Sequence, residues 1–144
     1  MNLKPGLSRK TYQNRSMSKT EIRHPDKLVS TGAYSAGVMV DGWLYISGQG
    51  PLDVATGKVI SGSIEEETSL TLTHVKKIVE QAGGRMEDII KCTVHLADIN
   101  NFDRYDVVYG SFFSGTKPAR TTVQSVLSDG IKIEIDAVAR IINK

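Results

Sequence analysis

Arg120 is the side chain with the clearest capacity for chemistry. It stands two residues after Pro118, where a polar linker, 114–116, ends and a β-branched run begins. Proline fixes its own φ and keeps the preceding residue out of the helical region, so the segment enters a strand at a defined angle. An arginine at that point offers a rigid fork of five donors that binds a carboxylate bidentately. The competing interpretation is a solvated surface arginine, because arginine is mostly exposed in proteins.

Further polar groups stand near the ends of expected strands and could line a site with Arg120. They are Tyr34, Ser47, Gly48, Gln49 and Glu134. Each also fits an ordinary structural role, as a half-buried aromatic, a strand-ending or loop residue, or a solvated strand position. These residues alone indicate an α+β domain but do not decide its activity.

Several familiar chemistries are not predicted. His24, His74 and His95 fall in no zinc-binding spacing, and there is neither a nucleophile elbow nor a phosphate-binding glycine loop. We interpret His74 and His95 as polar-face residues. The single cysteine, Cys92, lies in an apolar strand pattern and is expected to be a core thiol.

Composition indicates one ordinary globular domain in the 144 residues, with 40% hydrophobic and 24% charged side chains. No apolar run is long enough to span a bilayer and no secretory signal is evident, so we expect a cytoplasmic protein without membrane contact. Residues 1–23 carry six basic side chains and one acidic, whereas the rest carries 12 basic and 15 acidic. This distribution argues against nucleic-acid binding and, without an evident histidine pair, against RNA cleavage.

The polar, aperiodic start predicts a flexible basic extension over residues 1–19, followed by one domain over 20–144. Met17 is a candidate alternative start, because organised sequence begins soon after it.

Local signals predict the first half of the domain. Asp41-Gly42 between two β-rich runs predicts a two-residue hairpin turn. Ser63 with Glu66 forms the pattern of a capping box, and an apolar stripe from Thr68 to Ala82 predicts a helix that ends at the Gly83-Gly84 pair. Strand, helix and strand in this order favour a parallel βαβ unit.

The second half is predicted to contribute two or three strands and one helix. Ile90, Cys92, Val94 and Leu96 alternate with polar residues and indicate a strand. A helix capped by Asn100 or Asn101 is expected next, with five aromatic or aliphatic side chains inward. Strands over 123–127 and 131–142 complete the sheet. Because two helices cover only one side, the other side is a reasonable place for oligomerisation.

With these residues in hand, the chain resembles the reactive-intermediate deaminase (Rid, or YjgF) family from about residue 22 to 141. Five blocks in the same order carry the resemblance: 32–36 (GAYSA), 46–51 (ISGQGP), 94–99 (VHLADI), 117–123 (KPARTTV) and 133–139 (IEIDAVA). The resemblance implies a chorismate-mutase-like α+β fold, with two helices on one face of a mixed sheet. It also implies a homotrimer with a central β-barrel and clefts between subunits.

The activity implied by the resemblance is hydrolysis of 2-iminopropanoate or 2-iminobutanoate to the 2-oxo acid and ammonia, without cofactor or metal. Arg120 would clamp the substrate carboxylate and Glu134 would position water or move its proton. Tyr34 would form one wall of the cleft, and Ser47 and Gly48 would form its floor.

Two of the cleft positions differ from the family pattern. Thr122 replaces a frequent cysteine, so thiol chemistry is not expected there, and Asp106 replaces a common asparagine. The carboxylate of Asp106 would repel an anionic substrate unless it is turned away or paired. An alternative substrate is therefore another enamine or imine, such as a 2-aminomuconate-like catabolic intermediate. A second alternative is a non-catalytic trimer that binds small acids or proteins.

Overall fold

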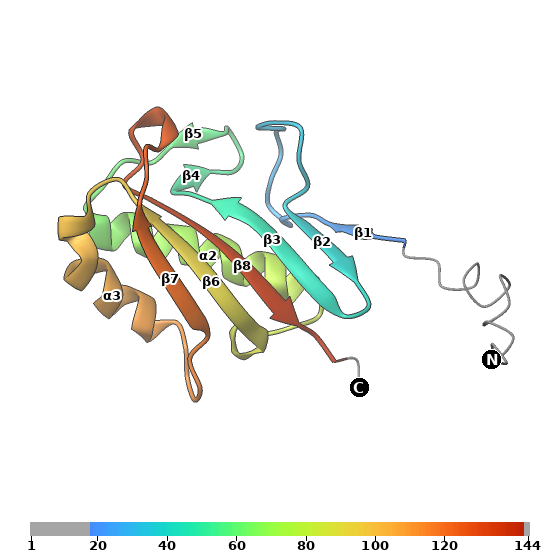
Figure 1. Cartoon of the computed structure of the whole chain (residues 1–144). Helices are drawn as coiled ribbons and strands as arrows, with labels where there is room; N and C mark the ends of the chain where they lie inside the picture. Colours follow the sequence, from blue (N-terminus) through green and yellow to red (C-terminus); the bar gives the residue numbers. More distant parts are fainter. Residues whose placement is uncertain (1–17, 143–144) are drawn as a thin grey trace, which may run out of the picture.

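The structure, a computed structural model, describes residues 18–142 as a six-stranded sheet with two helices packed on one face (Figure 1). The strand order is β1-β2-β3-β8-β6-β7, and all pairs are antiparallel except β6 with β7. The α+β class and the mixed sheet with two helices are confirmed. The predicted extension, except for residues 18 and 19, and the candidate start at Met17 lie outside the described residues.

The elements have the following bounds. The sheet contains β1 (Thr20–Ile22), β2 (Gly37–Val40), β3 (Trp43–Gln49), β6 (Ile89–Leu96), β7 (Ala119–Gln124) and β8 (Ile133–Arg140). A separate small ribbon pairs β4 (Leu52–Asp53) with β5 (Lys58–Val59). The helices are α2 (Ile64–Gln81) and α3 (Phe102–Ser111), and short 3-10 turns cover Met86–Asp88, Ile99–Asn101 and Ser128–Gly130. Neither α2 nor α3, the two α-helices of residues 18–142, is long and apolar enough to cross a membrane.

The predicted hairpin and the start of the first helix are confirmed. Asp41 and Gly42 have φ of 50° and 77°, the two positive values that a type I′ turn requires. At the start of α2, the Ser63 hydroxyl accepts from the backbone N–H of Glu66, and the Glu66 carboxylate accepts from that of Ser63. These elements depend on dihedral preferences and hydrogen bonds between close neighbours, so a short stretch of sequence specifies them.

Long-range strand pairing differs in one respect from the prediction. β3 precedes α2 in the sequence and β6 follows it. The two strands run parallel but are not adjacent, because β8 inserts between them and pairs antiparallel with both. The adjacent parallel unit is instead β6, α3 and β7. The C-terminal strand therefore occupies a central position in the sheet, which its place in the sequence does not reveal.

The core lies between the helices and the inward face of the sheet. Alternate residues of β8 from Ile133 to Ala139 are buried against the apolar stripe of α2, as predicted. Cys92 is completely buried, which confirms the expected core thiol. The prediction for Ile90 is wrong. The β6–β8 register shifts between Ile89 and Lys91, so that Ile89 enters the core and Ile90 is half exposed.

The start of α3 also differs from the prediction, because Asn101 precedes the helix without making a side-chain cap. Asp98 caps the preceding 3-10 turn by accepting from the backbone N–H of Asn100. Tyr105 and Tyr109 are buried on the inward side of α3, as expected.

The opposite face of the sheet is not covered by a helix in residues 18–142 (Figure 1). It mixes charged and aromatic side chains: Glu134 and Asp136 of β8 lie on it, and the half-exposed Tyr45 of β3 pairs with Val138. His95 lies on this face, as predicted, and its ring nitrogens are hydrogen-bonded to Ser125 and Asp136 at 3.0 and 3.3 Å.

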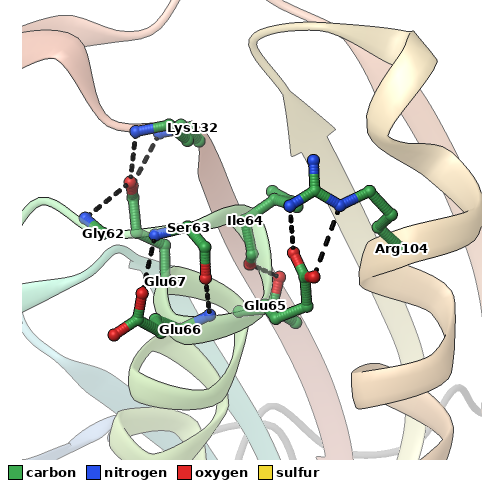
Figure 2. A network of polar contacts seen from close by, with 9 residues as sticks. Gly62, Ser63, Ile64, Glu65, Glu66, Glu67, Arg104 and Lys132 are labelled. Carbon is green, nitrogen blue, oxygen red and sulfur yellow. Dashed lines mark hydrogen bonds and ion pairs between the residues drawn. The ribbon is translucent and has the colours of Figure 1, made fainter.

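The carboxylate of Glu67 joins the first turn of α2 to the start of β8 (Figure 2). It is buried and accepts from the backbone N–H of Lys132 at 2.9 Å and from the Lys132 ammonium at 2.8 Å. A third bond comes from the backbone N–H of Gly62 at 3.3 Å. The arrangement fixes the residues that lead into β8 and satisfies a charge that would otherwise be costly to bury.

We therefore predict that Glu67→Ala lowers the free energy of unfolding by about 3–5 kcal/mol, because it leaves the Lys132 groups without their buried acceptor. Glu66→Ala is the matched control. It removes an exposed carboxylate one position earlier and should cost at most about 1.5 kcal/mol. Urea unfolding of both variants measures the difference, and equal losses would contradict this role for Glu67.

Candidate functional site

Arg120 is the second residue of β7, and its side chain lies on the helix-facing side of the sheet beside Cys92 of β6. The guanidinium carbon stands 4.7 Å from the ring centroid of Tyr109, 5.3 Å from that of Tyr105 and 5.4 Å from that of Phe102. These rings of α3 form an aromatic bed under the cation. The side chain is only 22% exposed, so the competing interpretation of a freely solvated arginine does not apply.

Asp106 of α3 pairs with this guanidinium. Arg120 donates from Nη1 to Asp106 Oδ1 at 2.5 Å, and the Asp106 side chain remains 46% exposed. Burial, the largest single effect, would lower the pKa of Arg120, but the hydrogen bond to Asp106 and the charge interactions with Tyr105, Asp106 and Tyr109 together raise it above its ordinary value. Arg120 is therefore a permanent cation whose partner faces solvent.

Thr122 follows Arg120 on the same side of β7, and its hydroxyl is hydrogen-bonded to that of Tyr105. This contact fixes the ring of Tyr105 beneath the guanidinium. We refer to Arg120, Thr122, Asp106, Tyr105 and Tyr109 as the arginine cluster. The three predicted residues Arg120, Thr122 and Asp106 are thus brought together, while both tyrosines were expected only as inward-facing residues of a helix.

The other predicted residues gather elsewhere, around a hollow of about 340 Å³ that we refer to as the glutamate pocket. Its lining includes four of them, Tyr34, Ser47, Gly48 and Glu134. It also includes residues that sequence analysis did not place in a site: Thr31, Gly50, Leu52, Ser128, Asp129 and Ile131. The additional residues come from loops, the 3-10 turn over Ser128–Gly130 and the two-residue strand β4, and such short segments carry no periodic signal that would have indicated them.

The floor of the glutamate pocket depends on a break in the β3–β8 pairing. The register shifts between Ile46 and Gln49, so Ser47 and Gly48 leave the regular ladder. A Cβ at Gly48 would stand 2.8 Å from the carboxyl group of Glu134, so only glycine fits without displacing that side chain. The Ser47 hydroxyl donates to the carbonyl of Ser35 at 2.6 Å and thereby holds the loop that carries Tyr34.

Tyr34 lines the rim of the pocket with its hydroxyl hydrogen-bonded to Thr31 and, at 3.2 Å, to the Lys27 ammonium. Burial opposes ionisation, yet the hydrogen bonds from Thr31 and Lys27 together lower the pKa of Tyr34. Lys27 also lies 4.8 Å from the centroid of the tyrosine ring. Lys27 and Thr31 therefore orient Tyr34, a role that the sequence alone did not indicate.

Arg120 and Glu134 lie on opposite faces of the sheet. Arg120 is level with the buried Cys92, whereas Glu134 is level with His95 on the uncovered face. Consecutive residues of a strand point to opposite sides, so this separation follows directly from the register. One copy of the chain consequently presents the arginine cluster and the glutamate pocket as two separate groups of residues.

His24 and His74 form a buried pair, which corrects the interpretation of His74 as a polar-face residue and of the chain as lacking a histidine pair. The two rings approach at 2.9 Å between His24 Nε2 and His74 Nδ1. The backbone N–H of Asp26 donates to His24 Nδ1, and His74 Nε2 donates to the carbonyl of Leu52. The two residues are 50 positions apart, so only packing of the segment after β1 against α2 brings them together.

The pair is structural in character. The bond from Asp26 fixes the proton of His24 on Nε2, which then donates to His74, so both rings must be neutral. Burial, and next the neighbouring His74, lowers the pKa of His24 from 6.5 to about 4, and burial likewise lowers that of His74. Within residues 18–142, no group of three or more His, Cys, Asp or Glu side chains is arranged to hold a metal ion.

Comparison with known proteins adds a family assignment. The sequence profile of the family described as Endoribonuclease L-PSP matches residues 24–141. The rat protein named 2-iminobutanoate/2-iminopropanoate deaminase is 39% identical over 109 residues, which cover 75% of this chain and 80% of that protein. A RutC family protein of Pyrococcus abyssi is 38% identical over 109 residues, covering 75% of this chain and 86% of that protein.

Solved structures agree with this result. Escherichia coli TdcF with bound serine is 34% identical, with a TM-score of 0.79 and coverage of 85% of this chain and 99% of that one. YyfA of Yersinia pestis, from the conserved Rid protein family, is 32% identical with a TM-score of 0.81, covering 86% of this chain and 100% of that one.

The histidine pair predicts a loss of stability in acid. An unfolded histidine titrates near 6.5, and the folded pKa of His24 is about 4, so the unfolded chain binds more protons between these values. The contribution of His24 should be complete above pH 6.5 and decline by about 3 kcal/mol as the pH falls toward 4. Unfolding midpoints measured across this pH range should fall more steeply with decreasing pH for the wild type than for the double variant His24→Gln/His74→Gln. Parallel curves would contradict the prediction.

Proposed function

The chain belongs to the family described as Endoribonuclease L-PSP, which includes the Rid proteins, and on that premise we propose that it hydrolyses reactive 2-imino acids and enamines. The proposed substrates include 2-iminopropanoate and 2-iminobutanoate, which would yield 2-oxo acids and ammonia. The observation that carries the proposal is the guanidinium of Arg120, held over an aromatic bed in a partly buried position. The deaminase names of mammalian relatives support it.

Arg120 would bind the substrate carboxylate. Among residues 18–142 the only hydrogen-bond partner of its guanidinium is Asp106, which uses one of the five N–H groups. An edge of the fork thus remains for a bidentate carboxylate. Because the C=N carbon is bonded directly to that carboxylate, clamping the carboxylate also fixes the reacting carbon, which is catalysis by orientation.

Glu134 would activate the attacking water. Its carboxylate can accept a proton from a water molecule as the oxygen adds to the C=N carbon of the protonated imine. The protonated Glu134 then returns that proton to the nitrogen of the carbinolamine, and ammonia leaves as the C=O bond forms and the hydroxyl proton passes to solvent. Tyr34 would donate a hydrogen bond from the pocket rim, while Ser47 and Gly48 would shape the surface near the nitrogen. No cofactor enters this scheme.

The separation of Arg120 from Glu134 favours a site shared between copies of the chain. β7 is an edge strand, so a second copy can approach the arginine cluster. The uncovered sheet face, with half-exposed Tyr45 and Trp43, offers a surface for association. We therefore propose a homotrimer with a central barrel, in which the arginine cluster of one subunit meets the glutamate pocket of the next.

The ion pair of Asp106 with Arg120 favours a second candidate, a deaminase of another enamine or imine such as a 2-aminomuconate-like intermediate. Because the Asp106 carboxylate already occupies part of the guanidinium, it weakens the binding of a small anion more than that of a larger substrate with further contacts. A third candidate is a non-catalytic trimer that binds small acids or proteins. The E. coli relative with bound serine supports binding of a small amino acid.

The first test is turnover. The protein is added to a threonine dehydratase acting on serine, with semicarbazide to trap the imine, and pyruvate and semicarbazone are followed. We expect faster imine hydrolysis with the wild type and a loss of about 100-fold or more in kcat/KM with Arg120→Ala. Arg104→Ala is the control, because this exposed arginine of α3 pairs with Glu65 instead. Equal activity of wild type and Arg120→Ala would contradict the proposal, and binding of a 2-oxo acid without turnover of any imine would favour the non-catalytic alternative.

The second test is complementation between subunits. Arg120→Ala and Glu134→Ala should each be inactive alone, because every shared site would lack one group. Co-refolded in equal amounts, they should regain about one quarter of wild-type activity, since about one interface in four combines both intact residues. Absence of recovery despite mixed oligomers would show that each site lies within a single copy.

A further inference from the structure

Asp106 gives the arginine cluster a charge balance that differs from that of a lone arginine. Its Oδ1 accepts from Arg120 at 2.5 Å, and the two opposite charges leave the pair without net charge. No hydrogen bond to Oδ2 is formed within residues 18–142, and the side chain is 46% exposed. One carboxylate oxygen is thus engaged, and the other is available to a ligand.

Neighbouring charges do not alter this balance. Arg104, two residues earlier on α3, is paired with Glu65 at 2.7 Å. Asp103 is exposed and makes no ion pair within the described residues. Among residues 18–142, the only cation paired with Asp106 is Arg120 itself, so a ligand carboxylate entering the site meets one positive and one negative charge.

This arrangement fits a dipolar ligand better than a simple anion. A carboxylate can occupy the part of the guanidinium that Asp106 leaves unused. The free Asp106 oxygen then stands next to it as an acceptor for a positively charged nitrogen on the same ligand. A ligand that carries only the carboxylate would instead experience repulsion from Asp106 with nothing to offset it.

We infer that Asp106 determines specificity at this site by favouring 2-imino acids that carry a cationic side chain over those with an uncharged side chain. The inference rests on the proposed deaminase activity. The chemical class is the imine of a basic amino acid, in which the carboxylate binds Arg120 and the flexible cationic end reaches Asp106.

The test compares two imines of almost equal size. An L-amino-acid oxidase, with catalase to remove peroxide, generates them from arginine and from citrulline, whose side chain is the uncharged counterpart. Hydrolysis by the deaminase is measured in competition with semicarbazide, with the oxidase rate held constant. For the wild type, kcat/KM should be about fivefold higher for the arginine imine, the size expected of a half-exposed ion pair.

In Asp106→Asn, which preserves the shape of the side chain, this ratio should approach one. The effect should appear in KM rather than in kcat, and KM for the citrulline imine should be lower than in the wild type. The control Asp103→Asn removes the same charge from α3 without touching Arg120 and should keep the wild-type ratio. High salt should weaken the preference of the wild type, because it screens exposed charges. Thermal unfolding of both variants verifies that they are folded.

The outcomes separate this inference from the proposed function. If the wild type hydrolyses both imines with the same ratio as Asp106→Asn, the inference is overturned while the deaminase activity stands. If the wild type hydrolyses neither imine nor 2-iminopropanoate, the proposed function fails and the inference fails with it. A ratio above one that disappears only in Asp106→Asn supports both.

Discussion

The alternation of side chains across a β-sheet is the constraint on which the arrangement of this protein depends. β8 occupies the centre of the sheet, so its even-numbered residues face away from the helices and its odd-numbered residues enter the core. The same period places Arg120 on the helix side of β7. Glu134 and Arg120 cannot share a face without a slip in register, and such a slip would expose the buried isoleucines of β8.

The arginine cluster and the glutamate pocket are held by different interactions. The arginine cluster relies on aromatic rings from α3 and on the charge of Asp106, both fixed by the crossover from β6 to β7. The glutamate pocket relies on a break in strand pairing at Gly48 and on the Glu67 carboxylate that secures the entry to β8. A partly buried cation and an open polar pocket are therefore stabilised by separate sets of contacts.

The sequence by itself determined the local structure and the identity of most candidate residues. The turn at 41–42, the capping box at 63–66 and the inward side of the last strand follow from positive φ, side-chain hydrogen bonds and apolar periodicity. Each depends on neighbours within a few positions, where dihedral preferences and spacing are sufficient. The motif around Arg120 likewise placed that residue where a strand begins, although β7 spans Ala119–Gln124 rather than the predicted 123–127.

Tertiary structure alone decided which distant residues meet. The pairing of Asp106 with Arg120, the insertion of β8 between β3 and β6, and the contact of His24 with His74 each join segments far apart in the chain. No local pattern encodes these contacts, because they result from packing the whole core at once. The sequence therefore indicated the chemical groups, whereas the fold set their charge balance and assigned them to opposite faces of the sheet.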